Sequence, residues 1–352
     1  MANPVPSEPD GSDLIGSKRE LTRAVERSVA DLDANDLVLV ACSGGPDSLA
    51  LAAVTAECAQ RGIVRAGAIV VDHQLQEHSQ DVAMAAGKQC VALGLDPVEV
   101  IEVNVAQGPG NSGLEAAART VRRQALVQAA GRHGASAILV AHTLDDQAET
   151  VLLGLARGSG ARSLAGMASE DGLWRRPLLS IRRTHVRAAL ESFGLRAYED
   201  PHNVDDAFAR VRVRRSALPA LESDLGPGVT EALARSAALL RADNEALDEW
   251  ARREAAVRLA TSAEGMTVAL VAAGIDLRTV PSAVRTRLLR TALLAAGVPG
   301  GSITSKHLRS VDALVGDWRG QGPVRLPGDI DARRESAKLV IYRAGPIRST
   351  GV

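Results

Sequence analysis

Two short polar segments of this sequence have the residue types and spacing to bind a phosphorylated ligand. The first reads Ser43-Gly-Gly-Pro-Asp-Ser48 and leads directly into a helical pattern over 47–61. Its glycines allow successive backbone N–H groups to converge, and the N-terminus of the following helix adds further unpaired N–H groups. Asp47 alone would repel a phosphate, so we expect it to hold Mg²⁺ that in turn binds the phosphate. The alternative is a glycine-rich turn with a serine cap.

The second segment is acidic and is expected to begin a helix. It spans residues 141–153 and reads Ala-His-Thr-Leu-Asp-Asp-Gln-Ala-Glu-Thr-Val-Leu-Leu. Asp145 lies four residues before Glu149 and Asp146 lies three before it, so the three carboxylates share one helix face. A bound cation, either Mg²⁺ or a substrate ammonium, would relieve their repulsion. The alternative is an acidic first turn on a solvated helix. His142 is a candidate base, a candidate phosphate donor or a packed strand-end histidine.

Both segments follow predicted strands of one sheet. Continuous apolar runs predict buried strands, and helical patterns separate them. The predicted strands cover 37–42, 67–71, 98–105 and 137–141, and the predicted helices cover 47–61, 76–94 and 113–133. This alternation predicts an α/β fold with a doubly wound, mostly parallel sheet. Ligands bind beyond the carboxyl ends of such strands, which is where both segments lie.

The second half of the chain predicts a smaller, mainly helical domain. Helical patterns cover 229–262, 281–297 and 304–316, and a short apolar run over 339–342 predicts a strand. Proline and glycine cluster over 219–228, which is typical of a domain boundary. We therefore expect three parts, namely a disordered N-terminal tail (1–17), a catalytic domain (18–222) and a mainly helical domain (223–352).

Charge is unevenly distributed along the chain. The net charge is −1, but residues 225–352 hold 18 basic and 13 acidic residues, whereas residues 1–224 hold 23 and 29. A basic C-terminal part hints at a polyanionic partner. Aromatic residues make up only 2% of the chain, which argues against a base-stacking RNA module of the RRM or OB type.

The cysteines and the N-terminus exclude further classes. The three cysteines, Cys42, Cys58 and Cys90, lie far apart, so a zinc ribbon, a clustered iron–sulfur site and a disulfide scaffold are not expected. No apolar run approaches the ~18 residues of a membrane span. The N-terminus lacks the basic and apolar regions of a signal peptide, so we expect a cytoplasmic protein that does not contact a membrane.

The two motifs resemble those of a known family. Residues 43–48 resemble the SGGxDS loop of the N-type ATP pyrophosphatases, the PP-loop superfamily, which cleave ATP between the α- and β-phosphates. Together with HxxDDQAET at 142–150, they resemble the tRNA(Ile)-lysidine synthetases. Further segments agree with this family, and the resemblance covers about residues 18–320; they lie at 113–122, 157–167, 176–179, 199–215 and 281–294.

The resemblance implies a two-step ligation with ATP and Mg²⁺ as cofactors. First, the carbonyl oxygen of the wobble cytidine in the CAU-anticodon isoleucine tRNA attacks the α-phosphate of ATP, and pyrophosphate leaves. Second, the ε-amine of free L-lysine attacks carbon 2 of the cytidine, and AMP leaves. The product is lysidine, which pairs with A instead of G. Related enzymes are often dimers, so a homodimer is consistent with the resemblance.

The resemblance implies roles for individual residues of this chain. Catalytic roles are expected for Asp47, Asp145, Asp146, Glu149 and Arg119. ATP is expected to bind Ser43, Gly44, Gly45, Pro46, Asp47, Ser48 and His142, with Asp47 also holding Mg²⁺. Contacts with tRNA are expected from Arg122, Arg210, Arg212, Arg214, Arg285, Arg287 and Arg290. The individual roles of the three carboxylates at 145–149 stay open, and the alternative for the arginines is a solvated helix face or surface ion pairs.

Three other functions remain as alternatives. A PP-loop tRNA thiolase usually needs paired cysteines, which this sequence lacks. Another adenylating tRNA-modifying enzyme would share the ATP chemistry, whereas a ligase of the GMP synthetase type would need a glutaminase half. A nucleotide-sensing RNA-binding module without turnover is the non-enzymatic alternative, and the intact acidic residues of both motifs argue against it.

Overall fold

The computed structural model describes residues 11–74, 78–104, 111–158, 160–262 and 265–344. The chain divides into two compact units, residues 1–241 and 242–352, which are described separately here. The long helix α10 (Val229–Arg258) belongs to both units, because the division falls within it. Among the described residues, no helix is both long and apolar enough to cross a bilayer.

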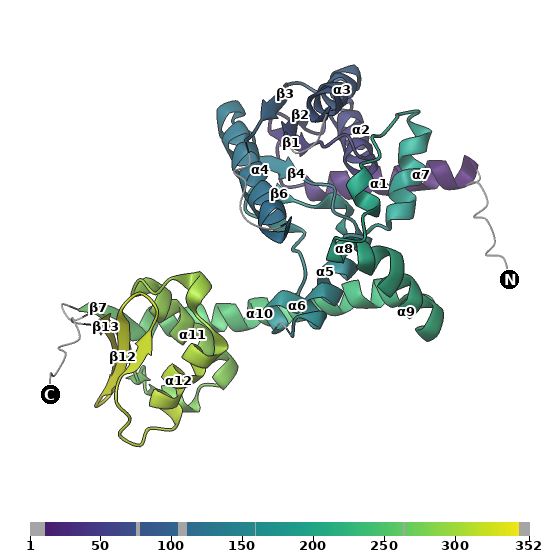
Figure 1. Ribbon diagram of the computed structural model, residues 1–352. Coiled ribbons are helices and arrows are strands. Elements are labelled where there is room, and N and C mark those ends of the chain that lie inside the picture. The colour runs from purple at the N-terminus through teal and green to yellow at the C-terminus, as the bar shows by residue number, and fades with distance from the viewer. Residues whose placement is uncertain (1–10, 75–77, 105–110, 159, 263–264, 345–352) are drawn as a thin grey trace. The chain divides into compact units, whose positions relative to one another are not determined.

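A six-stranded sheet forms the centre of the first unit (Figure 1). Its strands, in the order β3-β2-β1-β4-β6-β5, are Val98–Glu102, Arg65–Asp72, Leu37–Ala41, Ala137–Leu139, Trp174–Arg175 and Glu170–Asp171. All neighbours pair in parallel except β5, which pairs antiparallel with β6. In the central register, Val40 of β1 lies between Ala68 of β2 and Leu139 of β4. The predicted doubly wound, mostly parallel sheet is confirmed.

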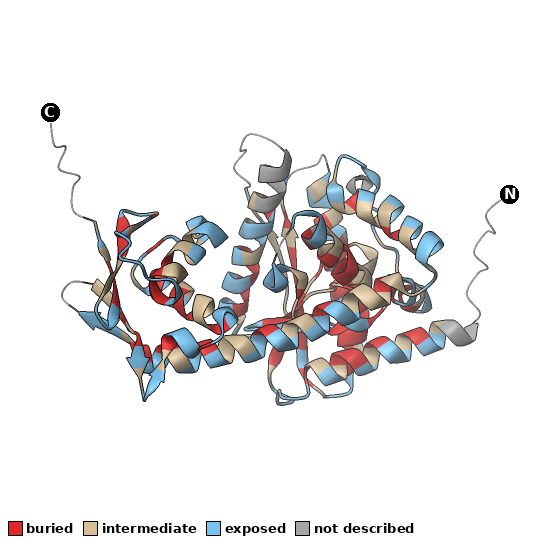
Figure 2. Ribbon diagram, turned by 90° about the horizontal axis from the view of Figure 1, so that it is seen from below, coloured by how far each residue is buried: buried red, intermediate tan, exposed pale blue. Residues whose placement is uncertain are grey.

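Helices cover both faces of this sheet, which explains why its strands are apolar on both sides. Val38 and Val40 pack into a core with helices α1 (Gly11–Ser28), α2 (Pro46–Gln60) and α7 (Arg183–Ser192). Leu37 and Leu39 point to the other face and pack against Leu126 of α4 (Asn111–His133). Helix α3 (Ser79–Ala92) packs against β2 and β3. Figure 2 shows the buried residues gathered on the strands and the adjoining helices.

The predicted disordered tail over 1–17 is wrong from Gly11 onward, because α1 begins there. Ser17, Leu21 and Val25 are buried at helical spacing, so this segment packs onto the sheet as an amphipathic helix. Polar and charged residues between them mask this pattern in the sequence. Residues 1–10 lie outside the described part of the chain.

Short helices link the sheet to α10. They are α5 (Leu144–Ala156), α6 (Ala161–Leu164), η1 (Pro177–Ser180), η2 (Pro201–Val204), α8 (Ala209–Arg212), the π-helical η3 (Val213–Ala217) and α9 (Leu218–Leu225). The Glu222 carboxylate on α9 accepts hydrogen bonds from the backbone N–H groups of Gly228, Val229 and Thr230 and from the Thr230 hydroxyl. These bonds, those from Thr230 above all, lower the pKa of Glu222 to about 2. Glu222 thereby satisfies the free N–H groups at the start of α10.

The second unit combines helices with an antiparallel sheet. Helices α11 (Ser282–Ala295) and α12 (Ser305–Gly316) pack with the end of α10 on a five-stranded sheet. In the order β11-β12-β13-β8-β7, its strands are Val324–Leu326, Ile330–Glu335, Lys338–Arg343, Gly265–Ala269 and Leu259–Ser262. Two smaller strands, β9 (Val271–Ala272) and β10 (Ile275–Asp276), pair with each other, and two short turns, η4 (Leu277–Thr279) and η5 (Gly300–Ser302), complete the unit.

The predicted helices of this unit are present, but most of its strands were not predicted. Only the run at 339–342, which lies within β13, was predicted as a strand. The helix predicted over 229–262 ends at Arg258, and the next four residues form β7. The helical pattern appeared to continue because β7 is short and half exposed, and its pairing with β8 is a tertiary effect.

Candidate active site

The predicted phosphate loop leaves the carboxyl end of β1 and enters α2. Gly44 has φ +80°, and a Cβ at that position would lie 3.1 Å from the Ala86 Cβ of α3, so the turn favours glycine. Gly45 is the extended N-cap residue of α2, and Pro46 is its first helical residue. The Ser48 hydroxyl accepts from the Ser43 N–H (3.1 Å) and donates to the Gly45 carbonyl (2.9 Å). The loop is thus closed by its own serines, with the N-terminus of α2 at its base.

The acidic segment starts α5 directly after β4. Thr143 caps this helix, and its side chain and backbone N–H bond reciprocally with Asp146 at 2.8–3.3 Å. Since β1 and β4 pair in parallel, the phosphate loop and the start of α5 leave the same edge of the sheet. The structure therefore brings together the two motifs that the sequence placed about 100 residues apart.

Arg183, the first residue of α7, joins the two motifs and was not predicted. Its guanidinium lies 3.3 Å from Asp47 Oδ2, 2.7 Å from Asp146 Oδ1 and 3.3 Å from Glu149 Oε1. The side chain is 14% exposed. Burial disfavours its charge, but the carboxylates, Asp146 foremost, outweigh burial and raise the pKa of Arg183 above its usual value. A permanently charged group thus stands where the phosphate loop meets α5.

The three acidic residues of α5 share some of their arginine partners, since Arg183 and Arg214 each contact both Asp146 and Glu149. The Asp145 carboxylate accepts from the Arg183 backbone N–H (2.7 Å) and pairs with the Arg182 side chain (3.3 Å). Glu149, whose side chain is fully buried, pairs with Arg214 (2.7 Å) and Arg210 (3.5 Å) besides Arg183. A buried carboxylate needs such partners, because desolvation without them would disfavour its ionised form.

The pKa values of Asp47 and Asp146 are shifted in opposite directions in this site. Burial raises the pKa of the Asp47 carboxyl, and Arg183 offsets only part of this rise. Burial acts in the same direction on Asp146, but Arg183 and the Thr143 hydrogen bonds outweigh it, so that its pKa is lowered. The Oδ1 atom of Asp47 is buried and has no hydrogen-bond partner among the described residues. A carboxylate oxygen in this state is suited to a ligand that brings positive charge.

This donor set fits a magnesium ion that arrives with a nucleotide. Among the described residues, no three His, Cys, Asp or Glu side chains gather as a closed metal cage. Mg²⁺ usually takes only one or two carboxylates and completes its shell with phosphate oxygens and water. The unpartnered oxygen of Asp47, next to a phosphate loop, provides one such carboxylate.

Two histidines at strand ends are neutral near pH 7. Burial lowers the pKa of His142 to about 4 despite the nearby Asp146 carboxylate, and its Nδ1 atom has no hydrogen-bond partner among the described residues. Burial and the charge of Arg122 lower the pKa of His73 to about 4. Arg122 Nε donates to His73 Nε2 (2.9 Å). His142 can therefore donate or accept a hydrogen bond as a neutral ring.

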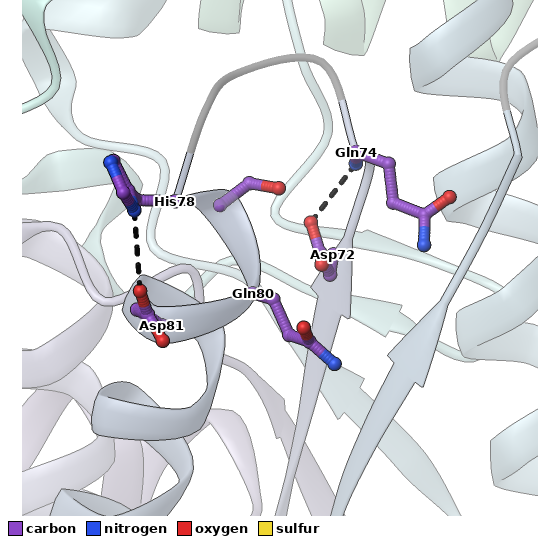
Figure 3. A pocket seen from close by; sticks show the side chains of 6 residues that line it. Asp72, Gln74, His78, Gln80 and Asp81 are labelled. Carbon is purple, nitrogen blue, oxygen red and sulfur yellow. Dashed lines mark hydrogen bonds and ion pairs between the residues drawn. The ribbon is translucent and has the colours of Figure 1, made fainter.

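An open polar cavity of about 410 Å³ lies at the carboxyl end of β2. It is lined by Asp72, Gln74, His78, Ser79, Gln80 and Asp81 (Figure 3). The Gln74 N–H donates to Asp72 Oδ1 (2.9 Å), and His78 lies 3.4 Å from Asp81. Because β2 neighbours β1, this cavity opens at the same sheet edge as the phosphate loop.

The arginines expected to contact tRNA have very different surroundings. In the first unit, Arg210 and Arg214 point at Glu149, and Arg122 is exposed on α4, as is Arg119, which was predicted to act in catalysis. Arg212 is also exposed, and it donates to the backbone carbonyls of Asp206 and Ala207.

In the second unit, the three arginines on α11 donate to internal acceptors. Arg285 forms a two-bonded pair with Asp312 (2.6 and 2.9 Å). Arg287 donates to Asp248 (2.7 Å) and Asn244 (2.6 Å). Arg290 donates to the Gly300 carbonyl (3.3 Å). Side-chain exposure is 11% for Arg285 and 16% for Arg287, so the main role of both arginines is to stabilise the second unit through internal ion pairs.

Sequence reasoning missed Arg182 and Arg183, although a signal was present. Two adjacent arginines at the start of a helix oppose its dipole, whose N-terminal end favours acidic residues. Such a placement indicates an anionic partner. Here the partners are Glu231 and Asp145 for Arg182, and Asp47, Asp146 and Glu149 for Arg183.

Comparisons with known proteins agree with this geometry. A family model described as a PP-loop domain matches residues 17–221, and one described as a TilS substrate binding domain matches residues 275–340. The chain is 51% identical to a tRNA(Ile)-lysidine synthase of Thermobifida fusca over 90% of this chain and 95% of the relative. It is 52% identical to that of Streptomyces coelicolor over 87% and 85%. It is 48% identical to that of Mycolicibacterium paratuberculosis over 96% and 100%.

Among solved structures, the chain is similar to a U34-tRNA thiolase of Methanococcus maripaludis, which carries a 4Fe–4S cluster. The TM-score is 0.53 at 23% identity, covering 65% of this chain and 80% of that one. At this identity the likeness supports the shared PP-loop fold alone. In the described residues of this chain, all three cysteines are buried.

Proposed function

This chain belongs to the tRNA(Ile)-lysidine synthase family, and we propose that it ligates L-lysine to carbon 2 of the wobble cytidine in the CAU-anticodon isoleucine tRNA, cleaving ATP to AMP and pyrophosphate. The observation that carries this proposal is the meeting of the phosphate loop and the acidic helix at Arg183. One site thereby offers anion-binding N–H groups for a nucleotide and carboxylates for an amine.

In the first step, the cytidine carbonyl oxygen attacks the α-phosphate, and the bond to the β-phosphate breaks. Negative charge develops on the leaving pyrophosphate. The backbone N–H groups of residues 43–48 and the N-terminus of α2 are proposed to stabilise that charge, with the Ser43 hydroxyl as a further donor. The Ser48 hydroxyl, which donates to the Gly45 carbonyl, is proposed to hold the loop in shape around the bound nucleotide. His142, which follows β4 and is neutral near pH 7, is proposed to donate a hydrogen bond to the nucleotide.

Asp47 is proposed to hold the magnesium ion through its unpartnered Oδ1 atom. When bound, the ion supplies Lewis-acid stabilisation of phosphate charge. The raised pKa of Asp47 is consistent with a carboxylate that lacks its full cationic complement in the free protein.

In the second step, the lysine ε-amine attacks carbon 2, and AMP leaves as the C–O bond to the cytidine breaks. Lysine arrives as an ammonium, so a nearby carboxylate must hold it and accept a proton before attack. Asp146 and Glu149 are the proposed holders. The Asp145 carboxylate already caps α7, so its proposed role is to position Arg182 and Arg183.

We assign catalysis to residues 18–222 and tRNA contacts to residues 223–352, together with the arginines near the site. Arg119 is proposed to neutralise the adenylate, and Arg122, Arg210, Arg212 and Arg214 to contact tRNA phosphates. On α11, Arg285, Arg287 and Arg290 already donate to internal acceptors. We therefore propose that these three arginines contribute only a small part of the tRNA-binding energy, through the N–H groups that remain available. A tRNA substrate also favours a cytoplasmic enzyme. The homodimer stays a prediction, which light scattering can test.

Lysine incorporation tests the function. The purified chain is incubated with ATP, Mg²⁺, radiolabelled lysine and transcripts of the CAU-anticodon isoleucine tRNA or of methionine tRNA. We expect ATP-dependent labelling of the isoleucine transcript alone. ATP cleavage to AMP with no lysine in either tRNA would point to another adenylating tRNA-modifying enzyme. ATP binding without turnover would point to a sensing module.

A further inference from the structure

Every carboxylate oxygen of α5 that faces the site already has a partner. Asp146 uses Oδ1 for Arg183 and, at 3.6 Å, for Arg214, and it uses Oδ2 for Thr143. Glu149 uses Oε1 for Arg183 and Arg214, and Oε2 for Arg214 and Arg210. An ammonium that enters this arrangement meets carboxylates whose charge is already balanced. Lysine therefore has to compete with a guanidinium for them.

Arg183 is the partner best placed to leave. Its Nε atom already lies 3.3 Å from Asp47 Oδ2 in the phosphate loop, while its other two nitrogens reach Asp146 and Glu149. Its backbone N–H is fixed by Asp145, so the guanidinium can turn toward the loop without moving α7. A bound triphosphate would place strong acceptors beside that loop, and guanidinium–phosphate bonds are among the strongest in proteins.

We propose that Arg183 is an internal counter-cation that occupies Asp146 and Glu149 until ATP binds, so that lysine binds tightly only to the nucleotide-loaded enzyme. This inference rests on the proposed function, because it concerns the order in which that function's substrates bind. When the phosphates draw Arg183 away, Asp146 and Glu149 lose a positive charge. The lysine ammonium replaces it.

A purely structural ion pair makes a different prediction. If Arg183 only braced the fold, lysine would bind the free and the nucleotide-loaded protein equally well. If the lysine ammonium instead replaces Arg183 at Asp146 and Glu149, the binding of nucleotide and the binding of lysine are coupled. Thermodynamic linkage then requires lysine to tighten nucleotide binding by the same factor as nucleotide tightens lysine binding.

Equilibrium dialysis of radiolabelled L-lysine against the full chain tests the exchange. The chain is used alone and with Mg²⁺ and α,β-methylene-ATP, which cannot be cleaved between the α- and β-phosphates. We expect the analogue to tighten lysine binding about tenfold or more, within the usual range of coupling between sites. Lysine should tighten analogue binding by the same factor.

Three variants sharpen the result. In Arg183→Gln, lysine should bind the nucleotide-free protein as tightly as it binds the loaded wild type, and the analogue effect should vanish. Arg183→Lys keeps the charge but cannot bridge three carboxylates, so it should retain part of the effect. The matched control is Arg187→Gln, one turn further along α7, where an exposed arginine pairs with Glu199 at 3.8 Å. It should keep the full wild-type effect.

The outcomes separate this inference from the function itself. A wild type that incorporates lysine into tRNA but binds it equally with and without the analogue overturns the exchange and leaves the function standing. A wild type that neither incorporates nor binds lysine overturns both. If Arg183→Gln does not fold, as judged by its circular-dichroism melt, the wild-type analogue effect and Arg183→Lys still decide the question.

Discussion

Arginine–carboxylate pairs in the two units look alike but stand in different surroundings. In the first unit, Arg183 reaches three carboxylates beside a phosphate loop, and Asp47 Oδ1 there has no partner in the described chain. In the second unit, Arg258 is fully buried and pairs with Glu254 while donating to the carbonyls of Ala269, Leu270 and Ile275. In the second cluster Arg258 is paired with a carboxylate and with backbone carbonyls, whereas the first cluster contains a buried carboxylate oxygen that has no partner among the described residues.

A functional charge cluster can be distinguished from a structural one by whether its charges and hydrogen-bond donors are balanced within the protein. Arg258 ties the end of α10 to the strands that follow, and its ion pair and carbonyl bonds balance its charge and its donors. Around Arg183, burial still raises the pKa of Asp47 despite the nearby guanidinium. A carboxyl whose pKa is shifted beside an anion-binding loop is typical of a functional site.

The largest effect is expected from Glu149→Gln. This change leaves the partly exposed Arg210 and Arg214 facing a neutral amide instead of a buried carboxylate, which should cost about 1–3 kcal/mol in the free energy of unfolding. Lysine incorporation into tRNA should fall by about 100-fold or more, since the proposed holder of the ammonium is lost. Urea unfolding and the incorporation assay measure the two effects at a temperature where the variant is folded.

Glu254→Gln is the matched control in the second unit. It removes the carboxylate partner of Arg258, so it should lower stability as well. Lysine incorporation into tRNA should not change. An equal loss of lysine incorporation in both variants would contradict the contrast between the two clusters.

Asp47→Asn should abolish tRNA adenylation and yet stabilise the free protein. Because its folded-state pKa is raised, Asp47 favours folding when protonated, and this contribution is lost as the pH rises through that pKa. Removing the charge should therefore raise the melting temperature at pH 7 by about 2–4 °C, the shift expected from ~1 kcal/mol in a unit of this size. The gain should shrink as the pH falls into the acid range, because the wild-type carboxyl then becomes protonated and neutral as well. A lower melting temperature at pH 7 would contradict this account.

Much of the site was predictable because topology decides where strand ends meet. Two motifs after parallel strands had to reach one sheet edge, and Asp47, Asp146 and Glu149 do so. Arg183 was not predicted, because it lies outside both motifs in the sequence, and its contacts with them arise only in the folded chain. The sheet of the second unit was missed because its short strands, such as β7, depend on partners for their conformation.

The arginines of α11 show the same limit. Their spacing on a helix suggested a phosphate-contacting face, but sequence does not tell which face turns inward. Arg285 and Arg287 bond to Asp312, Asp248 and Asn244. An exposed arginine and an internally bonded one are indistinguishable until their neighbours are known.

Salt dependence of tRNA binding distinguishes these two kinds of arginine. The slope of log affinity against log salt is negative, and each lost phosphate contact should reduce its magnitude by about 0.7–0.9. Arg212→Ala should reduce the magnitude by one such step, since Arg212 is exposed beside the site. Arg285→Ala should reduce the magnitude of the slope by much less than one step, and it should lower the stability of the second unit by about 1–3 kcal/mol, because Asp312 loses its partner. A full step for Arg285→Ala would contradict the small share proposed for this residue.

The smallest effect concerns acid stability. His142 has a pKa of about 4 in the folded chain, below its usual value of 6.5. Between these values the unfolded chain binds a proton that the folded chain does not, so stability falls as the pH drops through this window. In His142→Gln, the loss of unfolding free energy between pH 7 and pH 5 should be smaller than in the wild type. An equal loss in both proteins would mean that His142 is protonated in the folded state.

The most direct test of the central claim follows the α-phosphate. The chain is incubated with α-³²P-labelled ATP, Mg²⁺ and the CAU-anticodon isoleucine transcript without lysine, and unlabelled lysine is added afterwards. The account predicts label on the tRNA before lysine is added, its release as AMP afterwards, and no label on the tRNA with Asp47→Asn. Label found on lysine instead of on the tRNA would contradict the account, because the activated group would then be the amino acid and not the cytidine.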